Sequence, residues 1–117
     1  MTIRIAQDRI TRSELERLAK ETYVEMIKAV VDVRQGTLAI GGELHTDVET
    51  MLLENGSAKK DLWGINIYFR DSLAESLEYS SLINVRPQDN NRSLLVKDEA
   101  VRQKILSLVE KFVDWGA

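Results

Sequence analysis

The sequence predicts one α+β domain, in which a mainly antiparallel sheet of four to five strands carries helices on one face. Apolar, β-branched runs and amphipathic stretches of helical spacing follow one another in the order β-α-β-β-α-β-β-α. The strands come in neighbouring pairs rather than in strict strand–helix alternation, which favours antiparallel pairing. The chain has 117 residues, the size of one ordinary domain, so residues 1–117 are expected to fold as a single unit.

The expected elements are strands at 2–6, 27–33, 37–40, 62–69 and 79–85, and helices at about 12–25, 47–55 and from about 98. Thr11 with Glu14, and Thr46 with Glu49, have capping-box spacing, in which each side chain satisfies a free amide of the first helical turn. These pairs predict where the first two helices begin. Gly56 is placed to end the second helix, because glycine adopts the left-handed conformation at a helix end.

Charge and composition exclude several function classes. The 16 Lys and Arg are interleaved with 19 Asp and Glu, for a net charge of −3, whereas phosphate-backbone binding needs clustered basic residues. Nucleic-acid binding is therefore disfavoured, although a structured pocket for an anion or an RNA end stays open. The lack of cysteine excludes disulfides and thiolate chemistry and fits a reducing compartment. No apolar run reaches the roughly 18 residues of a membrane span, and we expect a cytoplasmic protein without a membrane partner.

Alternation within the strands sets a group of polar residues apart from the apolar core. Neighbouring strand residues point to opposite faces, so Trp63, Ile65 and Ile67 share one face and a second face carries polar side chains. We expect Trp63 in the core. If the segment at 41–45 is extended, Glu43 and His45 project to this second face as well. The candidate site comprises Asp32, Glu43, His45, Asn66, Asn84 and Arg86.

Two interpretations of this polar set stay open. In the first it is a ligand site, with Glu43 or the sole histidine, His45, as candidate for proton transfer near neutral pH. The predicted ligand-binding residues are then Asp32, Asn66, Asn84 and Arg86, whose amide and guanidinium donors suit a small anionic ligand. In the second, Arg86 pairs with Asp32 or Glu43, and the asparagines satisfy loop backbone.

Metal and cofactor binding are not expected. Glu43, His45 and Asp47 have alternate spacing, but one histidine without cysteine would make a weak, oxygen-rich metal site. Asp47 is explained more simply as a favourable charge at a helix N-terminus. The sequence has no Gly-rich phosphate loop, nucleophile elbow or paired-histidine motif. It does not decide whether the protein is an enzyme.

Trp115 lies beyond the buried stripe of the last helix and has two interpretations. Either it folds back onto the core, or it anchors a subunit contact, since tryptophan is enriched at interface hot spots. Together with the missing catalytic motifs, this favours a non-catalytic binding or interaction protein, with a homodimer or other homo-oligomer as one form. The alternative is a small-molecule-binding protein or hydrolase that uses the polar sheet face.

Five strings of the sequence resemble a family of small bacterial and cyanobacterial proteins described as a domain of unknown function. They are Lys28-Ala29-Val30-Val31-Asp32, Gly42-Glu43-Leu44-His45, Leu53-Glu54-Asn55-Gly56-Ser57, Asp61-Leu62-Trp63-Gly64-Ile65-Asn66 and Ile83-Asn84-Val85-Arg86-Pro87. The resemblance runs from the first helix to the last. It implies a stand-alone prokaryotic protein and supplies no catalytic residue.

Overall fold

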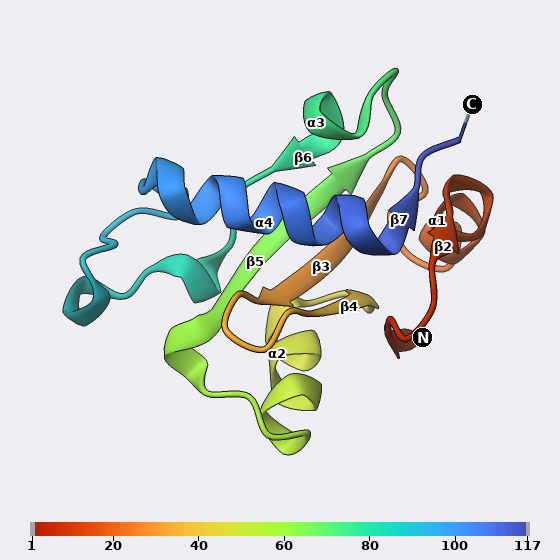
Figure 1. Ribbon diagram of the computed structural model, residues 1–117. Coiled ribbons are helices and arrows are strands. Elements are labelled where there is room, and N and C mark those ends of the chain that lie inside the picture. Colours follow the sequence, from red (N-terminus) through yellow and green to blue (C-terminus); the bar gives the residue numbers. More distant parts are fainter. Residues whose placement is uncertain (1, 117) are drawn as a thin grey trace.

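A computed structural model describes residues 2–116 and shows a five-stranded antiparallel sheet with helices on both faces (Figure 1). Across the sheet the strands are β1 (Ile3–Ile5), β4 (Thr37–Gly41), β3 (Met26–Asp32), β5 (Leu62–Tyr68) and β6 (Leu77–Glu78). The helices are α1 (Arg12–Ala19), α2 (His45–Glu54), α3 (Leu73–Ser76) and α4 (Glu99–Phe112). The α+β class and the antiparallel sheet are as the sequence predicts.

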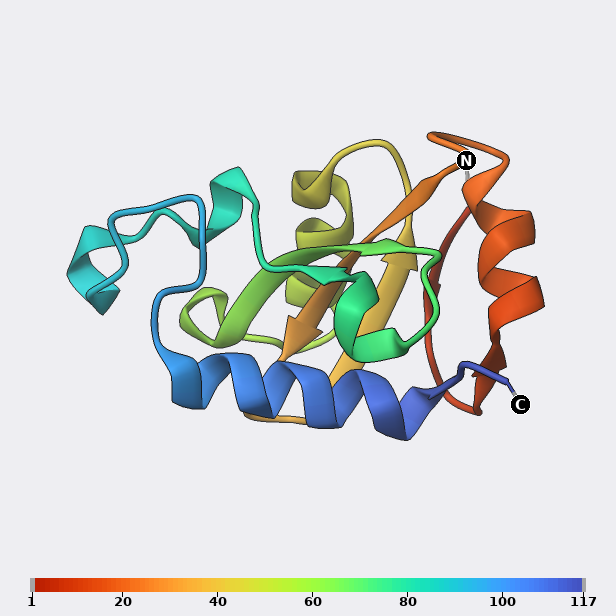
Figure 2. The ribbon, with the colours of Figure 1, turned by 90° about the horizontal axis from the view of Figure 1, so that it is seen from above.

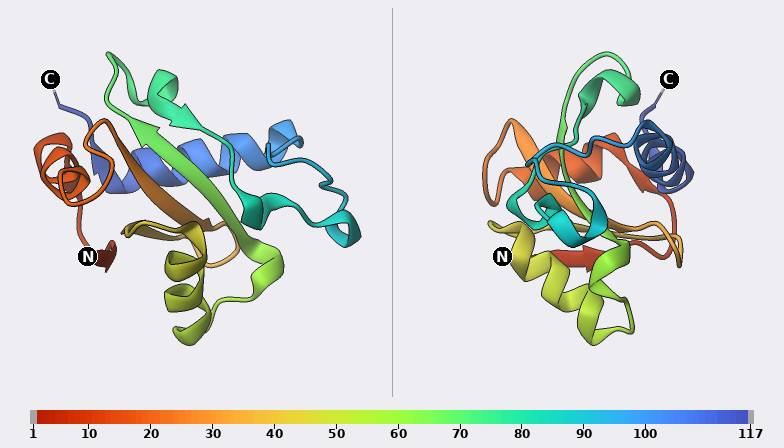
Figure 3. Two further views of the ribbon diagram at one scale, coloured as in Figure 1. Left: turned by 180° about the vertical axis from the view of Figure 1, so that it is seen from behind. Right: turned by 90° about the vertical axis from the view of Figure 1, so that its left-hand side faces the viewer.

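The helices do not all lie on one face, and this part of the prediction is wrong. Val31 on β3 packs in the core beneath α1 and α4, whereas its neighbour Val30 packs with Val48 and Leu52 of α2. Figure 3 (right) shows α2 and α4 on opposite sides of the strands. Consecutive apolar residues such as Val30 and Val31 mark a strand that is buried on both faces.

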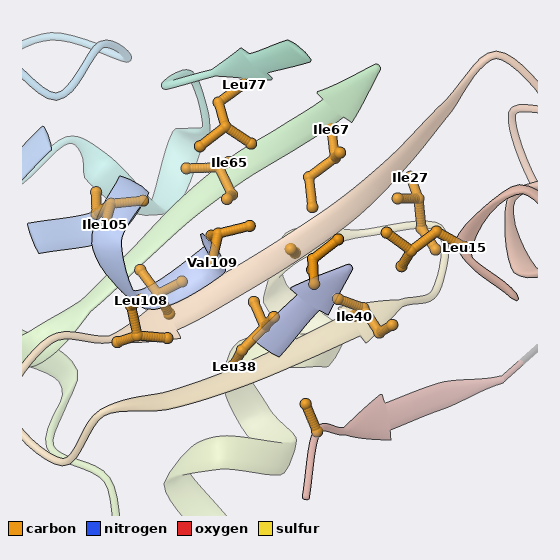
Figure 4. Close-up of a cluster of buried hydrophobic side chains, with 14 of the residues drawn as sticks. Leu15, Ile27, Leu38, Ile40, Ile65, Ile67, Leu77, Ile105, Leu108 and Val109 are labelled. Atoms are coloured by element: carbon orange, nitrogen blue, oxygen red, sulfur yellow. The ribbon is translucent and has the colours of Figure 1, made fainter. Parts of the chain in front are cut away.

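The larger core lies between the sheet and the helices α1 and α4 (Figure 4). Ile105, Leu108 and Val109 of α4 are buried there, as the helical spacing predicts. Leu15 of α1 extends the same cluster at the other end of the sheet. Trp63 is only 7% exposed and belongs to this core, which confirms its predicted place.

The first helix ends earlier than its apolar spacing predicts. Its start is as expected, because the Thr11 hydroxyl accepts a hydrogen bond from the Glu14 amide at 3.2 Å. After Ala19 the chain turns, and Val24 takes a left-handed φ of 67° while its amide donates to the Ala19 carbonyl. This reversal lets the chain enter β3 at Met26. A left-handed β-branched residue is rare, so local sequence does not reveal it.

The second helix starts at His45, before the predicted capping box. Its N-cap is Leu44, and no side chain caps the first turn. The predicted end is confirmed: Gly56 has φ 99°, and its amide donates to the Leu53 carbonyl at 3.2 Å. The ring of His45, the first residue of the helix, contacts β5 at the Ile65 carbonyl, a tertiary contact that local sequence does not reveal.

The predicted strand at 79–85 is wrong. After β6 the chain forms a 3-10 helix at Leu82–Asn84 instead. The Asn84 amide pairs with the backbone of Gly64, accepting from its N–H at 2.8 Å and donating to its carbonyl at 3.0 Å. A side chain therefore takes the place of a neighbouring strand. Gly64 permits this approach, since a Cβ there would lie 2.6 Å from the Cβ of Ser81.

The C-terminal end packs against the first helix at one end of the sheet. Short strands β2 (Ile10–Thr11) and β7 (Val113–Asp114) pair in parallel there (Figure 2). Trp115 folds back: its indole N–H donates to the Arg70 carbonyl at 3.0 Å and its ring stacks over Phe69.

Among the described residues, no helix has the length and apolar character needed to cross a membrane.

Candidate ligand-binding pocket

A pocket of about 330 Å³ opens on the face of the sheet that α2 covers only in part. Its walls come from the start of α2, the strands β3 and β5, and the loop after β6. The lining residues are Lys28, Leu44, His45, Thr46, Asn66, Ser80, Ser81, Leu82, Ile83 and Leu94. This volume lies at the lower end of the range for small-molecule sites.

A row of polar side chains crosses the sheet at the pocket. Lys28, Asn66 and Glu78 are direct partners on β3, β5 and β6, so their side chains share a face. The Asn66 amide nitrogen donates to Glu78 Oε1 at 2.7 Å and to the Ser80 carbonyl at 3.3 Å. Asn66 Oδ1 is buried and accepts no hydrogen bond from the described residues. A buried acceptor without a hydrogen-bond donor costs about 1–3 kcal/mol of stability, so a ligand that donates to this oxygen would be favoured.

His45 stands at the first position of α2 and is 8% exposed. Its Nε2 lies 2.8 Å from the Ile65 carbonyl, and a carbonyl can only accept, so Nε2 carries the proton. Burial lowers the pKa of His45 to about 4, and the Ile65 hydrogen bond opposes this shift. The ring is therefore neutral at pH 7, and the Asn66 side chain is a second hydrogen-bonding neighbour that opposes the shift.

Lys28 is the charged group of the pocket. Its side chain is half-buried, and the ammonium lies 5.2 Å from the centroid of the Tyr23 ring. Burial lowers the pKa of Lys28, while the nearby Glu78 carboxylate opposes that effect. Within residues 2–116, Lys28 forms no ion pair. Its positive charge is thus available at the pocket wall.

The rim of the pocket is apolar. Leu44, Leu82 and Leu94 line it and are 55%, 79% and 45% exposed. Single exposed leucines are common, but several around one cavity are typical of a binding surface. The pocket therefore combines a polar floor with an apolar entrance.

Asp32, a predicted ligand-binding residue, lies away from the pocket and holds a turn. Its Oδ1 accepts from the amides of Arg34 and Gln35 at 2.9 and 2.8 Å, and its Oδ2 accepts from the Ser57 hydroxyl at 2.7 Å. Both carboxylate oxygens are occupied and the side chain is fully buried. These bonds fix the β3–β4 hairpin to the end of α2.

Arg86 is likewise buried in structural contacts. Its guanidinium lies 4.2 Å from the centroid of the Trp63 ring and donates to the carbonyls of Leu62 and Ile83 at 2.6 and 3.1 Å. Its ion-pair partner is Asp89, with Nε and Oδ2 3.1 Å apart, rather than either predicted carboxylate. Burial lowers the pKa of Arg86, and Asp89 opposes that shift.

Of the six predicted site residues, the pocket brings together His45 and Asn66. The Asn84 side chain instead hydrogen-bonds to the backbone of β5. Glu43 lies exposed outside the pocket, and its backbone carbonyl accepts a hydrogen bond from the Tyr23 hydroxyl at 2.6 Å. Within residues 2–116, no three His, Asp or Glu side chains gather as a metal site.

Sequence reasoning missed Lys28 and the leucine rim. The alternation that placed Asp32 on the polar face also places Lys28 there, so this signal was present in the sequence. The rim had no such signal, because Leu82 and Leu94 lie in segments whose path depends on the Asn84 side chain.

A comparison with protein families finds one whose model matches residues 4–112, described as Protein of unknown function (DUF5674). A search of the curated proteins and a search of the solved structures each found no match. The family description assigns no activity, so the geometry of the pocket carries the functional argument.

Proposed function

The chain belongs to this family of unknown function, and we propose that it is a non-catalytic binding protein that holds a small, mainly apolar molecule in the pocket beside α2. One observation carries the proposal: a pocket of about 330 Å³ has exposed leucines at its rim and, at its floor, the buried Asn66 oxygen without a hydrogen-bond donor among the described residues. Apolar surroundings with a few polar anchors are the usual composition of a small-molecule site.

The polar groups favour binding over hydrolysis. A general base works best when its pKa is near the working pH, and His45, with a pKa of about 4, is a weak base at pH 7. Its Nε2 is held by the Ile65 carbonyl. The Ser81 hydroxyl accepts from the Ile83 amide, and no described histidine–serine hydrogen bond activates a nucleophile.

Titration of the labelled protein with 1-hexanol and cyclohexanol, followed by NMR, tests this function. We expect saturable shifts of the amides of Thr46, Ser81 and Ile83, which surround the pocket. Thr46→Trp places a bulky ring at the pocket wall and should abolish the shifts. Thr50→Trp, one turn further along α2 and outside the lining, is the matched control and should keep them.

Equal affinity of both tryptophan variants for the alcohols, or saturable shifts confined to another surface, would contradict the proposal. Circular dichroism of each variant shows whether it is folded, so that lost binding can be assigned to the filled pocket.

A second candidate function is self-association through the apolar strip beside the pocket. Leu82, Val85, Leu94 and Leu95 are all exposed within one chain segment. We propose a homodimer as the form that would cover them. Sedimentation at rising protein concentration should show dimers that Leu82→Ser weakens. A strict monomer at the highest concentration reached rules this candidate out.

We also propose a cytoplasmic location and a bacterial origin. The cysteine-free sequence supports the first, since reducing compartments do not use disulfides, and the resemblance of the five strings supports the second. Fractionation of the source cells, followed by immunoblotting, tests the location; recovery with the envelope or the medium contradicts it.

A further inference from the structure

We infer that the ligand of this pocket is a small apolar monocarboxylate that carries a hydroxyl or amide N–H next to the carboxylate. This inference rests on the proposed function and adds the chemical class of the ligand. Lys28 pairs with the carboxylate, Asn66 Oδ1 accepts from the hydroxyl or N–H, and the leucines enclose the apolar body.

The carboxylate follows from the charge of the lining. Lys28 is the charged side chain that lines the pocket within residues 2–116, because His45 is neutral there. It forms no ion pair and is half-buried, and an ammonium in such weakly hydrated surroundings makes strong charge-assisted hydrogen bonds. One cation and no arginine suit a monoanion better than a phosphate dianion.

The start of α2 adds to this positive potential. Its N-cap is Leu44, no side chain caps the first turn, and His45 and Thr46 of that turn line the pocket. Free first-turn amides and the helix dipole favour a negative charge. The inference does not depend on this helix end alone, because Lys28 approaches the same cavity from β3.

The hydrogen-bond donor of the ligand follows from an acceptor on the floor. Asn66 Oδ1 belongs to the pocket lining, is buried and accepts no hydrogen bond from the described residues. A plain carboxylate would bring only further acceptors, whereas an adjacent hydroxyl or N–H can donate to this oxygen.

Three probes with the same apolar chain test the inference: racemic 2-hydroxyhexanoate, hexanoate and 1-hexanol. Each is titrated at pH 7 into the labelled full-length protein, with the amides of Lys28, Thr46 and Ser81 followed by NMR. We expect affinity to fall in that order, by about fivefold or more at each step, the size of one added polar contact.

Lys28→Met should abolish the preference for hexanoate over 1-hexanol while 1-hexanol binds as before. Lys104→Met is the matched control, because Lys104 is exposed on α4 and outside the pocket lining, and it should change none of the affinities.

Equal binding of hexanoate and 1-hexanol at these amides overturns the carboxylate assignment and leaves the proposed function intact. Equal binding of the two acids overturns the role of Asn66 Oδ1 as an acceptor. If none of the probes shifts these amides, the proposed function fails together with the inference.

Discussion

The two faces of the sheet are made by the same strands, yet they differ in how completely their side chains are packed and hydrogen-bonded. On the face toward α4, Ile65 and Ile67 are fully buried in a continuous apolar core. On the face toward α2, Gly64 and Asn66 alternate with them, and the apolar cluster around Val48 is smaller. The first face stabilises the fold, and the second leaves a pocket with unpaired polar atoms.

The largest expected effect is on the α4 face. Ile65→Asp places an unpaired carboxylate in the apolar core and removes the packing of the isoleucine. Together these costs exceed the roughly 5–15 kcal/mol by which a typical domain is stable. We expect an unfolded chain by circular dichroism. A cooperative melt near that of the wild type would show that the face assignment is wrong.

The next effect is a pH dependence on the α2 face. Because the pKa of His45 is about 4 in the fold and near 6.5 when unfolded, the unfolded chain binds more protons between these values. Stability should therefore fall as pH drops from 6.5 to 4, by about 3 kcal/mol at most. His45→Gln should flatten this part of the profile. Denaturant unfolding across that pH range, as the difference between wild type and variant, measures it.

If the two profiles run parallel from pH 7 to 4, the neutral, buried state assigned to His45 is wrong. Taking the difference matters because carboxylates also titrate in the lower part of this range.

A smaller loss is expected where the α2 face meets the loop after β6. Asn84→Ala removes two hydrogen bonds to Gly64 and leaves its buried backbone groups unpaired, at about 2–3 kcal/mol. Asn84→Asp keeps the acceptor for the Gly64 amide but loses the donor for its carbonyl. Chemical denaturation of the three proteins should rank the wild type first. No loss in the alanine variant would contradict the strand-replacing role of this amide.

The smallest effect is expected at Asn66, next to Ile65 but on the pocket face. Asn66→Ala removes the hydrogen bond to Glu78 and the longer one to the Ser80 carbonyl, and it also removes a buried oxygen that has no partner among the described residues, so the changes offset to within about 1 kcal/mol. A thermal melt checks this. A loss comparable to that of Ile65→Asp would end the distinction between the two faces.

The face of the sheet to which a strand residue points could be predicted from the sequence, but its contacts on that face could not. Period-2 alternation placed Ile65 and Asn66 on opposite faces, and the α4 stripe predicted the burial of Ile105. Alternation could not predict that Asn84 is fully buried against Gly64, because it gives the side to which a residue points and not what it meets.

The sequence by itself determined the α+β class, the antiparallel sheet, the starts of α1 and α4 and the end of α2, because these depend on local spacing, caps and turns. Only the tertiary structure decided that α2 covers the second face, that the 79–85 segment leaves the sheet, and that Lys28 meets His45 at one pocket. The physical reason is that each of these depends on contacts between residues far apart in the chain. The His45–Ile65 and Gly64–Asn84 hydrogen bonds each span 20 residues.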